Sequence, residues 1–237
     1  GTTEGGDSSL SIKQIQTNST IQIVRPGDIL GFYGITFSPD GGFVYFNAVK
    51  DAEVPSVYRA PTLGGMPERV LTNASSVQFS PGGDQISFIR QDPRANESAV
   101  FIANADGTNE RKIASKSGKE YFHGSAPWSP DGKQIAVLYV DNSLEPKPSK
   151  SIKLISVADQ SMSDLGSFRW SGFCDLVWHP SGDSLILVGA ENSVIGAQLW
   201  EVSYPSGSVR RLTDNRNGYY EISITSDGRS IVSGENY

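Results

Sequence analysis

ITFSPDGGFVYF, residues 35–46, decides the fold, because a short hydrophobic strand runs into a Ser-Pro-Asp-Gly turn and directly out into another strand. Four similar stretches follow it: VQFSPGGDQISF (77–88), APWSPDGKQIAV (126–137), LVWHPSGDSLIL (176–187) and ISITSDGRSIVS (222–233). The first residues of the five turns are spaced by 42, 49, 50 and 46 residues; they are Ser38, Ser80, Ser129, His179 and Thr225. A period of roughly 40–50 residues with several strands per unit is the signature of a β-propeller.

Each turn position has a physical reason. Proline at the second position pre-sets φ, and an Asp or Ser behind it can bond the local backbone. A glycine then supplies the positive φ that other residues rarely adopt; these glycines are Gly41, Gly83, Gly132, Gly182 and Gly228. The last turn has Ser226 where the others have proline, but it keeps Asp227 and Gly228.

A second family of hairpins lies between these turns. It covers residues 9–24, 56–71, 99–114, 151–166 and 198–213, each with turn-forming residues at its centre. Five hairpins of each kind predict an all-β fold of about twenty strands in four-stranded antiparallel blades. Their order in the chain predicts four complete blades, with a half-blade at each end.

Two interpretations of this order stay open. In one, the two half-blades pair and close a ring of five blades, which removes exposed edges. In the other, the chain is a piece of a longer protein whose propeller has six to eight blades. We expect residues 1–9 to be a flexible lead-in, residues 10–237 to be the propeller, and the chain to belong to a longer protein. Open blade edges would then favour self-association.

Composition and charge narrow the partners. The chain has 237 residues, a length that all-β folds use as one domain, and a net charge of −6, which argues against a nucleic-acid partner. No stretch approaches the roughly 18 apolar residues of a membrane span. The single cysteine, Cys174, rules out an internal disulfide, and we expect it to be a small buried residue.

Signatures of catalysis and of cofactor binding are weak. The two histidines, His123 and His179, lack the ligand spacing of a zinc site, and no phosphate-binding loop or Gly-x-Ser-x-Gly motif occurs, so we expect neither metal nor cofactor. The alternative is an enzyme in which Asp175 and Glu221, both four residues before their turns, act as a carboxylate pair on a carbohydrate.

Aromatic residues recur where the innermost strands begin. A binding site at the mouth of the central channel would use them to stack on a protein, a peptide or a small molecule. The candidates are Tyr33, His123, Phe173, Tyr219 and Tyr220, with Trp170 and Arg216 on the approaches. The competing interpretation is that these rings pack between adjacent blades.

The repeats resemble a known family. APWSPDGKQIAVLY (126–139) and VFIANADGTNERKIA (100–114) are similar to the WD-repeat-like blades of the TolB family. The segments at 21–48, 58–71, 98–114 and 198–228 resemble the C-terminal propeller of acidobacterial-type serine/threonine protein kinases. This resemblance covers nearly the whole chain from about Leu10 onward.

The resemblance implies a function for the chain. A kinase domain would lie in another part of the protein, so the propeller itself would be a non-catalytic sensor or interaction module of a bacterial signalling protein. It would lie outside the cytoplasmic membrane if the protein is a receptor kinase, and in the cytoplasm otherwise.

Overall fold

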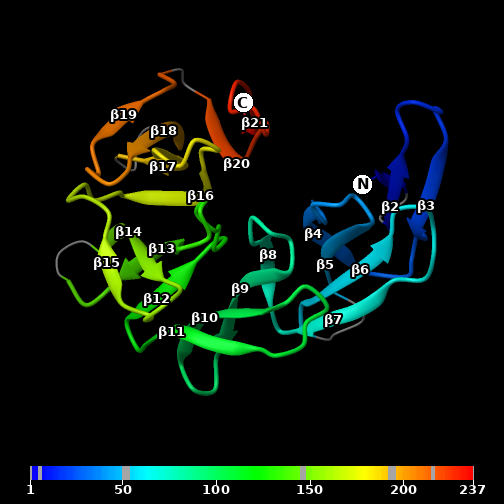
Figure 1. The fold of residues 1–237 in the computed structure, drawn as a ribbon, viewed down its shortest axis with the longest axis horizontal. Coiled ribbons are helices and arrows are strands. Elements are labelled where there is room, and N and C mark those ends of the chain that lie inside the picture. The colour runs from blue at the N-terminus through cyan, green and yellow to red at the C-terminus, as the bar shows by residue number, and fades with distance from the viewer. Residues whose placement is uncertain are drawn as a thin grey trace.

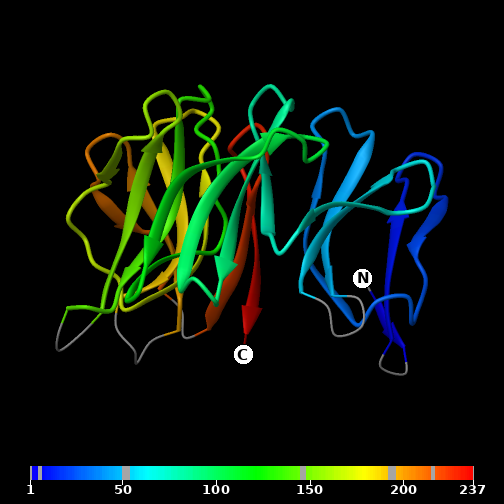
Figure 2. The same cartoon turned by 90° about the horizontal axis from the view of Figure 1, so that it is seen from below.

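The computed structural model describes residues 2–4, 7–49, 54–144, 148–191, 196–214 and 217–236. Within these ranges the chain forms 21 β-strands and no helix, which confirms the all-β prediction. The strands form small antiparallel sheets that follow one another around an arc (Figure 1). Seen after a turn by 90°, the blades lie side by side in a single layer (Figure 2).

Four of the sheets are complete blades of four strands in sequence order. Blade 1 consists of β4 (Gly31–Phe37), β5 (Phe43–Val49), β6 (Ser56–Pro61) and β7 (Glu68–Thr72). Blade 2 consists of β8 (Ser75–Phe79), β9 (Gln85–Asp92), β10 (Glu97–Asn104) and β11 (Arg111–Ser117). Blade 3 consists of β12 (Glu120–His123), β13 (Gln134–Asp141), β14 (Ser149–Ser156) and β15 (Met162–Asp164). Blade 4 consists of β16 (Gly172–Trp178), β17 (Ser184–Ala190), β18 (Gln198–Ser203) and β19 (Val209–Arg211).

A half-blade flanks the complete blades at each end. The N-terminal half-blade pairs β2 (Asp7–Lys13) with β3 (Thr20–Val24), and the C-terminal one pairs β20 (Gly218–Ile224) with β21 (Ile231–Asn236). The prediction of four blades and two halves is therefore confirmed. Within the expected lead-in, β1 (Thr2–Glu4) pairs antiparallel with residues 7–9 at the start of β2.

The two half-blades do not join into a fifth blade. They belong to separate sheets, and an open gap separates β20 and β21 from β2 and β3 (Figure 1). Each half-blade packs instead on its neighbour in the chain: the N-terminal one on blade 1 and the C-terminal one on blade 4. The ring is therefore open in this structure.

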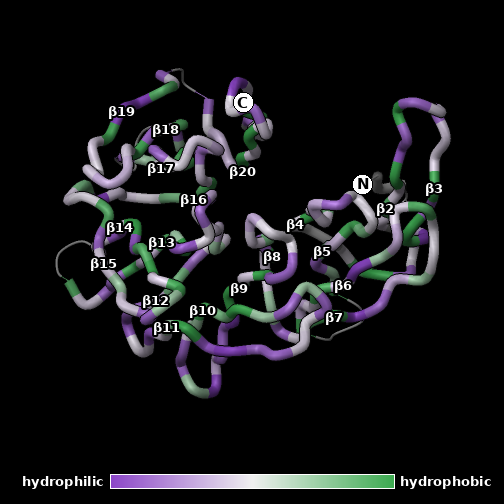
Figure 3. Tube along the Cα trace, in the orientation of Figure 1, coloured by the Kyte–Doolittle hydropathy of each residue, from purple (hydrophilic) through white to green (hydrophobic). Residues whose placement is uncertain are grey.

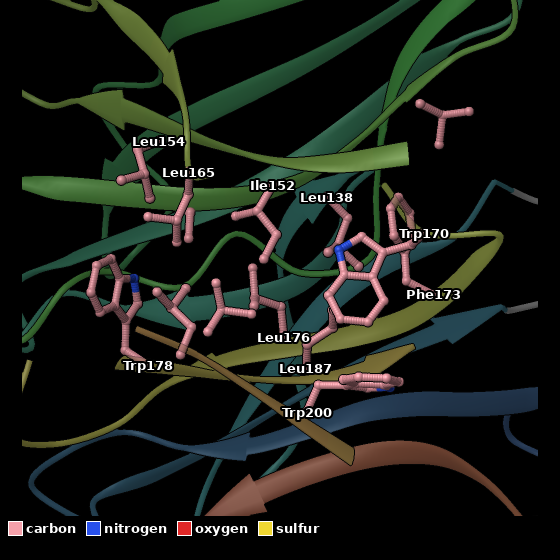
Figure 4. Packing of buried hydrophobic residues seen from close by; sticks show 14 residues of the cluster. Leu138, Ile152, Leu154, Leu165, Trp170, Phe173, Leu176, Trp178, Leu187 and Trp200 are labelled. Atoms are coloured by element: carbon pink, nitrogen blue, oxygen red, sulfur yellow. The ribbon is translucent and has the colours of Figure 1, made fainter. Parts of the chain in front are cut away.

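The hydrophobic core lies between blades rather than inside them. The largest cluster fills the space between blades 3 and 4 and includes three tryptophans, Trp170, Trp178 and Trp200 (Figure 4). Burying each Leu or Phe side chain of this cluster stabilises the fold by about 1.5–3 kcal/mol. Apolar residues follow the strands along the chain, and hydrophilic residues occupy many of the connecting turns (Figure 3).

The repeated turns form as their residues predict. In the first turn, the Ser38 hydroxyl donates to the carboxylate of Asp40 and accepts a hydrogen bond of 2.9 Å from the backbone N–H of Phe43. All five turn glycines adopt φ between +69° and +79°. The turn therefore closes on itself and fixes the register of the two strands that it joins.

The third repeat departs from this pattern. We expected a strand at residues 126–128, but β12 ends at His123, and only an isolated bridge joins Trp128 to Ile135. Pro127 lies in this segment and has no N–H to donate, which interrupts the ladder. The inner edge of blade 3 is consequently a loop.

Candidate functional site

A cavity of about 800 Å³ occupies the centre of the arc. The first strands or the entering loops of all four complete blades line it, together with β20 and β21. Its wall includes apolar and aromatic side chains, among them Phe79, Trp128 and Trp178, and two acidic residues, Asp175 and Glu221. This cavity is the central channel that the propeller prediction places at the ends of the inner strands.

The inner strands are irregular where they reach the channel. The pairing shifts between Tyr33 and Thr36 in β4, between Ser75 and Gln78 in β8, and between Tyr219 and Ile222 in β20. A bulge bends a strand and re-aims its side chains. The residue four positions before each turn lines the cavity in all five units; these residues are Gly34, Ser76, Ser125, Asp175 and Glu221.

Asp175 joins three consecutive units of the arc. Its carboxylate accepts hydrogen bonds from the Ser125 hydroxyl in blade 3 and from the backbone N–H of Leu176 in blade 4, both at 2.9 Å. Its second oxygen accepts one of 3.3 Å from the backbone N–H of Ile222 in the C-terminal half-blade. These three donors give Asp175 a structural role at the blade boundaries.

The structure brings the two predicted acids, Asp175 and Glu221, to one cavity. Burial raises the pKa of Asp175 above its usual value, and the negative charge of Glu221 adds to the rise, while its three hydrogen-bond donors oppose it. Glu221 itself is exposed. The acids thus differ: Asp175 is held by protein donors, and Glu221 faces the solvent.

Side chains from blades 3 and 4 meet near this wall of the channel. The ring of His123 stacks on Phe173 with 6.3 Å between centroids, and the ammonium of Lys150 lies 6.0 Å from the Phe173 ring. Partial burial and the positive charge of Lys150 lower the pKa of His123, so its imidazole is neutral at neutral pH. Phe173 is buried, which leaves His123 as the exposed member of the pair.

The two tyrosines of β20 face different surroundings. Tyr220 is 43% exposed and lines the cavity, whereas Tyr219 packs against the apolar cluster between blade 4 and the C-terminal half-blade. Arg216 lies outside the described residues. The side chain of Tyr33 also lies outside them, although its backbone belongs to β4.

Trp170 lies in the core. It is 3% exposed and packs edge-on against Trp200, with 5.1 Å between ring centroids (Figure 4). Its place before an inner strand suggests the rim of the channel, whereas its ring packs in the cluster between blades 3 and 4. We therefore leave Trp170 out of the candidate site.

Two further residues line the channel and are not among the predicted candidates. Trp128 and Trp178 each stand one residue before a turn, and both line the cavity. In each, the indole Nε1 is buried and has no hydrogen-bond partner in the described structure. Their shared place in the repeat was a usable signal, since the same position is Phe37 and Phe79 in blades 1 and 2.

The prediction for Cys174 was wrong in one respect. The residue is exposed and lines the cavity, because the bulge between Phe173 and Asp175 turns it out of the sheet. Partial burial of the sulfur and the neighbouring Asp175 charge raise the pKa of the thiol, which therefore stays protonated at neutral pH. A protonated thiol is a poor nucleophile.

Within the described ranges, no three His, Cys, Asp or Glu side chains are grouped so that they could hold a metal ion. The same part of the chain contains no helix with the length and apolarity of a membrane span.

No protein-family model matches the chain. An uncharacterized protein of Agrobacterium fabrum is 30% identical over 112 residues, which are 44% of this chain and 38% of that protein. An uncharacterized peptidase of Bacillus subtilis is 24% identical over 226 residues, which are 91% of this chain and 31% of that protein. The matches thus span 38% and 31% of the length of these curated relatives.

Solved structures share the fold at low sequence identity. A candidate TolB from Agrobacterium tumefaciens superimposes with a TM-score of 0.72 at 23% identity, over 96% of this chain and 77% of that one. An oligogalacturonate lyase from Vibrio parahaemolyticus gives a TM-score of 0.68 at 10% identity, over 98% of this chain and 66% of that one. A chain of a nidogen/laminin complex gives 0.67 at 13% identity, over 96% and 81%. The chain therefore has the β-propeller fold of the TolB-like proteins.

Proposed function

We propose that this propeller is a non-catalytic binding module that receives an extended protein segment, a peptide or a small ligand in its central channel. The observation that carries the proposal is the cavity of about 800 Å³, whose wall comes from every unit of the arc that supplies an inner strand. A volume of this order suits ligand recognition. Self-association through the open blade edges is part of the same proposal.

The chemistry of the wall supports binding more than turnover. Tyr220 offers an exposed ring for stacking, and Glu221 offers an exposed negative charge. Asp175 is occupied by three donors, Cys174 stays protonated, and His123 is neutral and packed on Phe173. The fold is shared with a chain of a nidogen/laminin complex, so propellers of this shape do take part in protein complexes.

The role of this module in a larger protein is also part of the proposal. The resemblance to the C-terminal propellers of bacterial serine/threonine kinases suggests that it senses a ligand or recruits a partner for a signalling protein. That resemblance stays a prediction.

A phage-displayed library of random peptides, selected on the purified chain, tests the binding proposal. We expect the selected peptides to lose affinity at least about tenfold when Tyr220→Ala replaces the channel ring. The control variant, Leu63→Ala, removes a side chain that is 78% exposed in the turn after β6, away from the channel, and should leave affinity unchanged. Equal affinity for both variants, with unchanged melting temperatures, would overturn the channel as the binding site.

One observation favours an enzyme as the second candidate. Asp175 has a raised pKa and shares its cavity with a second acid, as a carbohydrate hydrolase or lyase would require. Cleavage of a polysaccharide panel that is lost in Glu221→Gln, with folding retained, would support this candidate and contradict the non-catalytic proposal.

A further inference from the structure

Blade 1 borders the gap and exposes a face whose equivalent is buried in the other units. The residue three positions before each turn points back toward the preceding unit, and in four of the five units it is at most 7% exposed; these residues are Val77, Ala126, Leu176 and Ile222. The equivalent residue of blade 1 is Ile35, which is 45% exposed. Phe37, two residues later, is 52% exposed, whereas its equivalents Trp128 and Trp178 are buried.

The reason lies in which strands of a blade the N-terminal half-blade contains. The N-terminal half-blade covers β5 and β6 of blade 1 with the cluster around Leu10, Ile23 and Phe46. It supplies only the third and fourth strands of a blade, because β2 and β3 occupy those places. Among the described residues, no first or second strand therefore covers the back of β4.

On the opposite side of the gap, the C-terminal half-blade also exposes a face that is buried in the complete blades. The residue seven positions after each turn points forward to the next unit and is buried in all four complete blades; these residues are Tyr45, Ser87, Ala136 and Ile186. In the C-terminal half-blade this residue is Val232, which is 68% exposed. The half-blade supplies first and second strands, and no described residue covers their forward face at Val232.

The repeat fixes the register in which the two halves would pair. In the complete blades, the residue nine positions after the turn pairs with one residue of the third strand: Asn47 with Val57, Ile89 with Val100, Leu138 with Ile152 and Val188 with Leu199. In blades 1 and 2 that third-strand residue directly precedes a bulge toward the fourth strand. In the N-terminal half-blade the bulge follows Leu10.

The equivalent pair across the gap is therefore Gly234 with Leu10. In this register Ser233 lies opposite Ser11, and Val232 lies opposite Ile12. Ile12 packs on the cluster that faces blade 1, so Val232 beside it would turn toward the bare Ile35 and Phe37. One pairing thus covers both exposed faces.

We propose that β20 and β21 of a second copy of this chain dock beside β2 and β3 in the order β20, β21, β2, β3. Residues 232–234 then pair with residues 10–12, and the incoming strand displaces β1, which pairs with residues 7–9 on the same edge of β2. Within one chain, each half-blade is held on its own neighbour by a buried cluster, and the gap keeps them apart (Figure 1). A second copy brings the missing strands without opening either cluster. Each copy has one donor face and one acceptor face, so the contact is head-to-tail.

Disulfide trapping with single-cysteine chains tests the register and the source of the strands. In a Cys174→Ser background, Ser11→Cys on a tagged chain is mixed with Ser233→Cys on an untagged chain under mild oxidation. We expect a mixed disulfide dimer of one tagged and one untagged chain. The control pair, Ser11→Cys with Glu235→Cys, presents the same face two residues out of register and should cross-link far less. Equal cross-linking of the two pairs would overturn the register.

A chain carrying both Ser11→Cys and Ser233→Cys separates the two modes of closure. Cross-linked species of twice the chain mass support the second copy. An oxidised chain that stays monomeric but migrates faster would mean that the ring closes on itself, and this result would overturn the proposal.

Light scattering over a wide range of protein concentrations gives an independent test. We expect the mass to rise with concentration, and Val232→Glu to weaken association at least about tenfold. The control Met66→Glu introduces the same charge at a residue that is 89% exposed in the connection between β6 and β7, and it should leave association unchanged. A monomer at every concentration, or an equal effect of the two variants, would overturn the proposal.

Discussion

The hydroxyl of Ser125 donates a hydrogen bond of 2.9 Å to the carboxylate of Asp175 across the boundary between blades 3 and 4. The same carboxylate accepts the backbone N–H of Ile222 from the next unit, so one acidic side chain links three units at the channel wall. Other boundaries use neutral groups: Asn47 bonds the backbone of Ala74 and Ser76, and Ser87 bonds the carbonyl of Ala126.

This link predicts that the two channel acids respond differently to truncation. Asp175→Ala should lower the free energy of unfolding by about 2–4 kcal/mol, because it leaves three donors without their charged acceptor. Glu221→Ala should change it by less than about 0.5 kcal/mol, since the side chain is exposed. Urea unfolding of both variants measures the difference. Similar losses of stability in the two variants would contradict the conclusion that Asp175, and not Glu221, links the three units.

The turns predict that the protein loses stability in acid. Hydroxyl and backbone donors lower the pKa of Asp40, Asp131 and Asp227 below 3.8 and that of Asp159 to about 2. A carboxyl whose pKa is lower in the folded state contributes stability above its unfolded pKa, and this contribution is lost as pH falls through the folded pKa. Asp175 acts in the opposite direction, because its pKa is raised.

The carboxyls whose pKa is lowered outnumber Asp175, whose pKa is raised. The urea concentration at the midpoint of unfolding should therefore fall as pH drops from about 5 to about 2. Replacing Asp131 with Asn removes one of these titrations and should flatten the dependence slightly. A midpoint that is constant or rises toward low pH would contradict this account of the turns.

Two buried tryptophans differ in the hydrogen bond that they make. The Trp200 indole N–H donates 2.9 Å to the carbonyl of Gly189, whereas the Trp128 N–H has no partner among the described groups. Phenylalanine removes the N–H from either site with a comparable loss of ring volume. We therefore expect Trp200→Phe to cost about 1 kcal/mol more than Trp128→Phe in thermal or urea unfolding. Equal costs would imply that Trp128 bonds a water or another group.

Two glycines with the same backbone conformation differ in the space available for a Cβ atom. Gly41 and Gly207 both have φ of +70°, but a Cβ on Gly41 would meet nothing within 4 Å. A Cβ on Gly207 would lie 2.2 Å from the Cα of Gly166, where the turn of blade 4 meets the end of blade 3. Gly41→Ala should cost about 1 kcal/mol from the backbone alone. Gly207→Ala should cost more, because the two turns must move apart; differential scanning calorimetry measures both.

The sequence predicts local features of this protein better than contacts between units. Ser38, Asp40 and Gly41 determine their turn through bonds made within a few residues, so the repeat, the strands and the two half-blades could be read directly. The direction of a side chain beside a bulge depends on the neighbouring blade. For this reason the sequence left open whether Trp170 lies at the rim or between blades, and the exposure of Cys174 was not predicted. The link from Asp175 to Ser125 spans 50 residues and has no local signal.

The hydrophobic clusters between units differ in size, and this difference determines the order in which the units unfold. Fourteen buried residues hold blades 3 and 4 together, whereas four buried residues hold the C-terminal half-blade on blade 4. Stacked repeats behave as a one-dimensional chain of neighbours, so opening begins at a weakly held end and moves inward. Amide hydrogens of β13, β14, β16 and β17 should therefore exchange with solvent last, and those of β20 and β21 among the first.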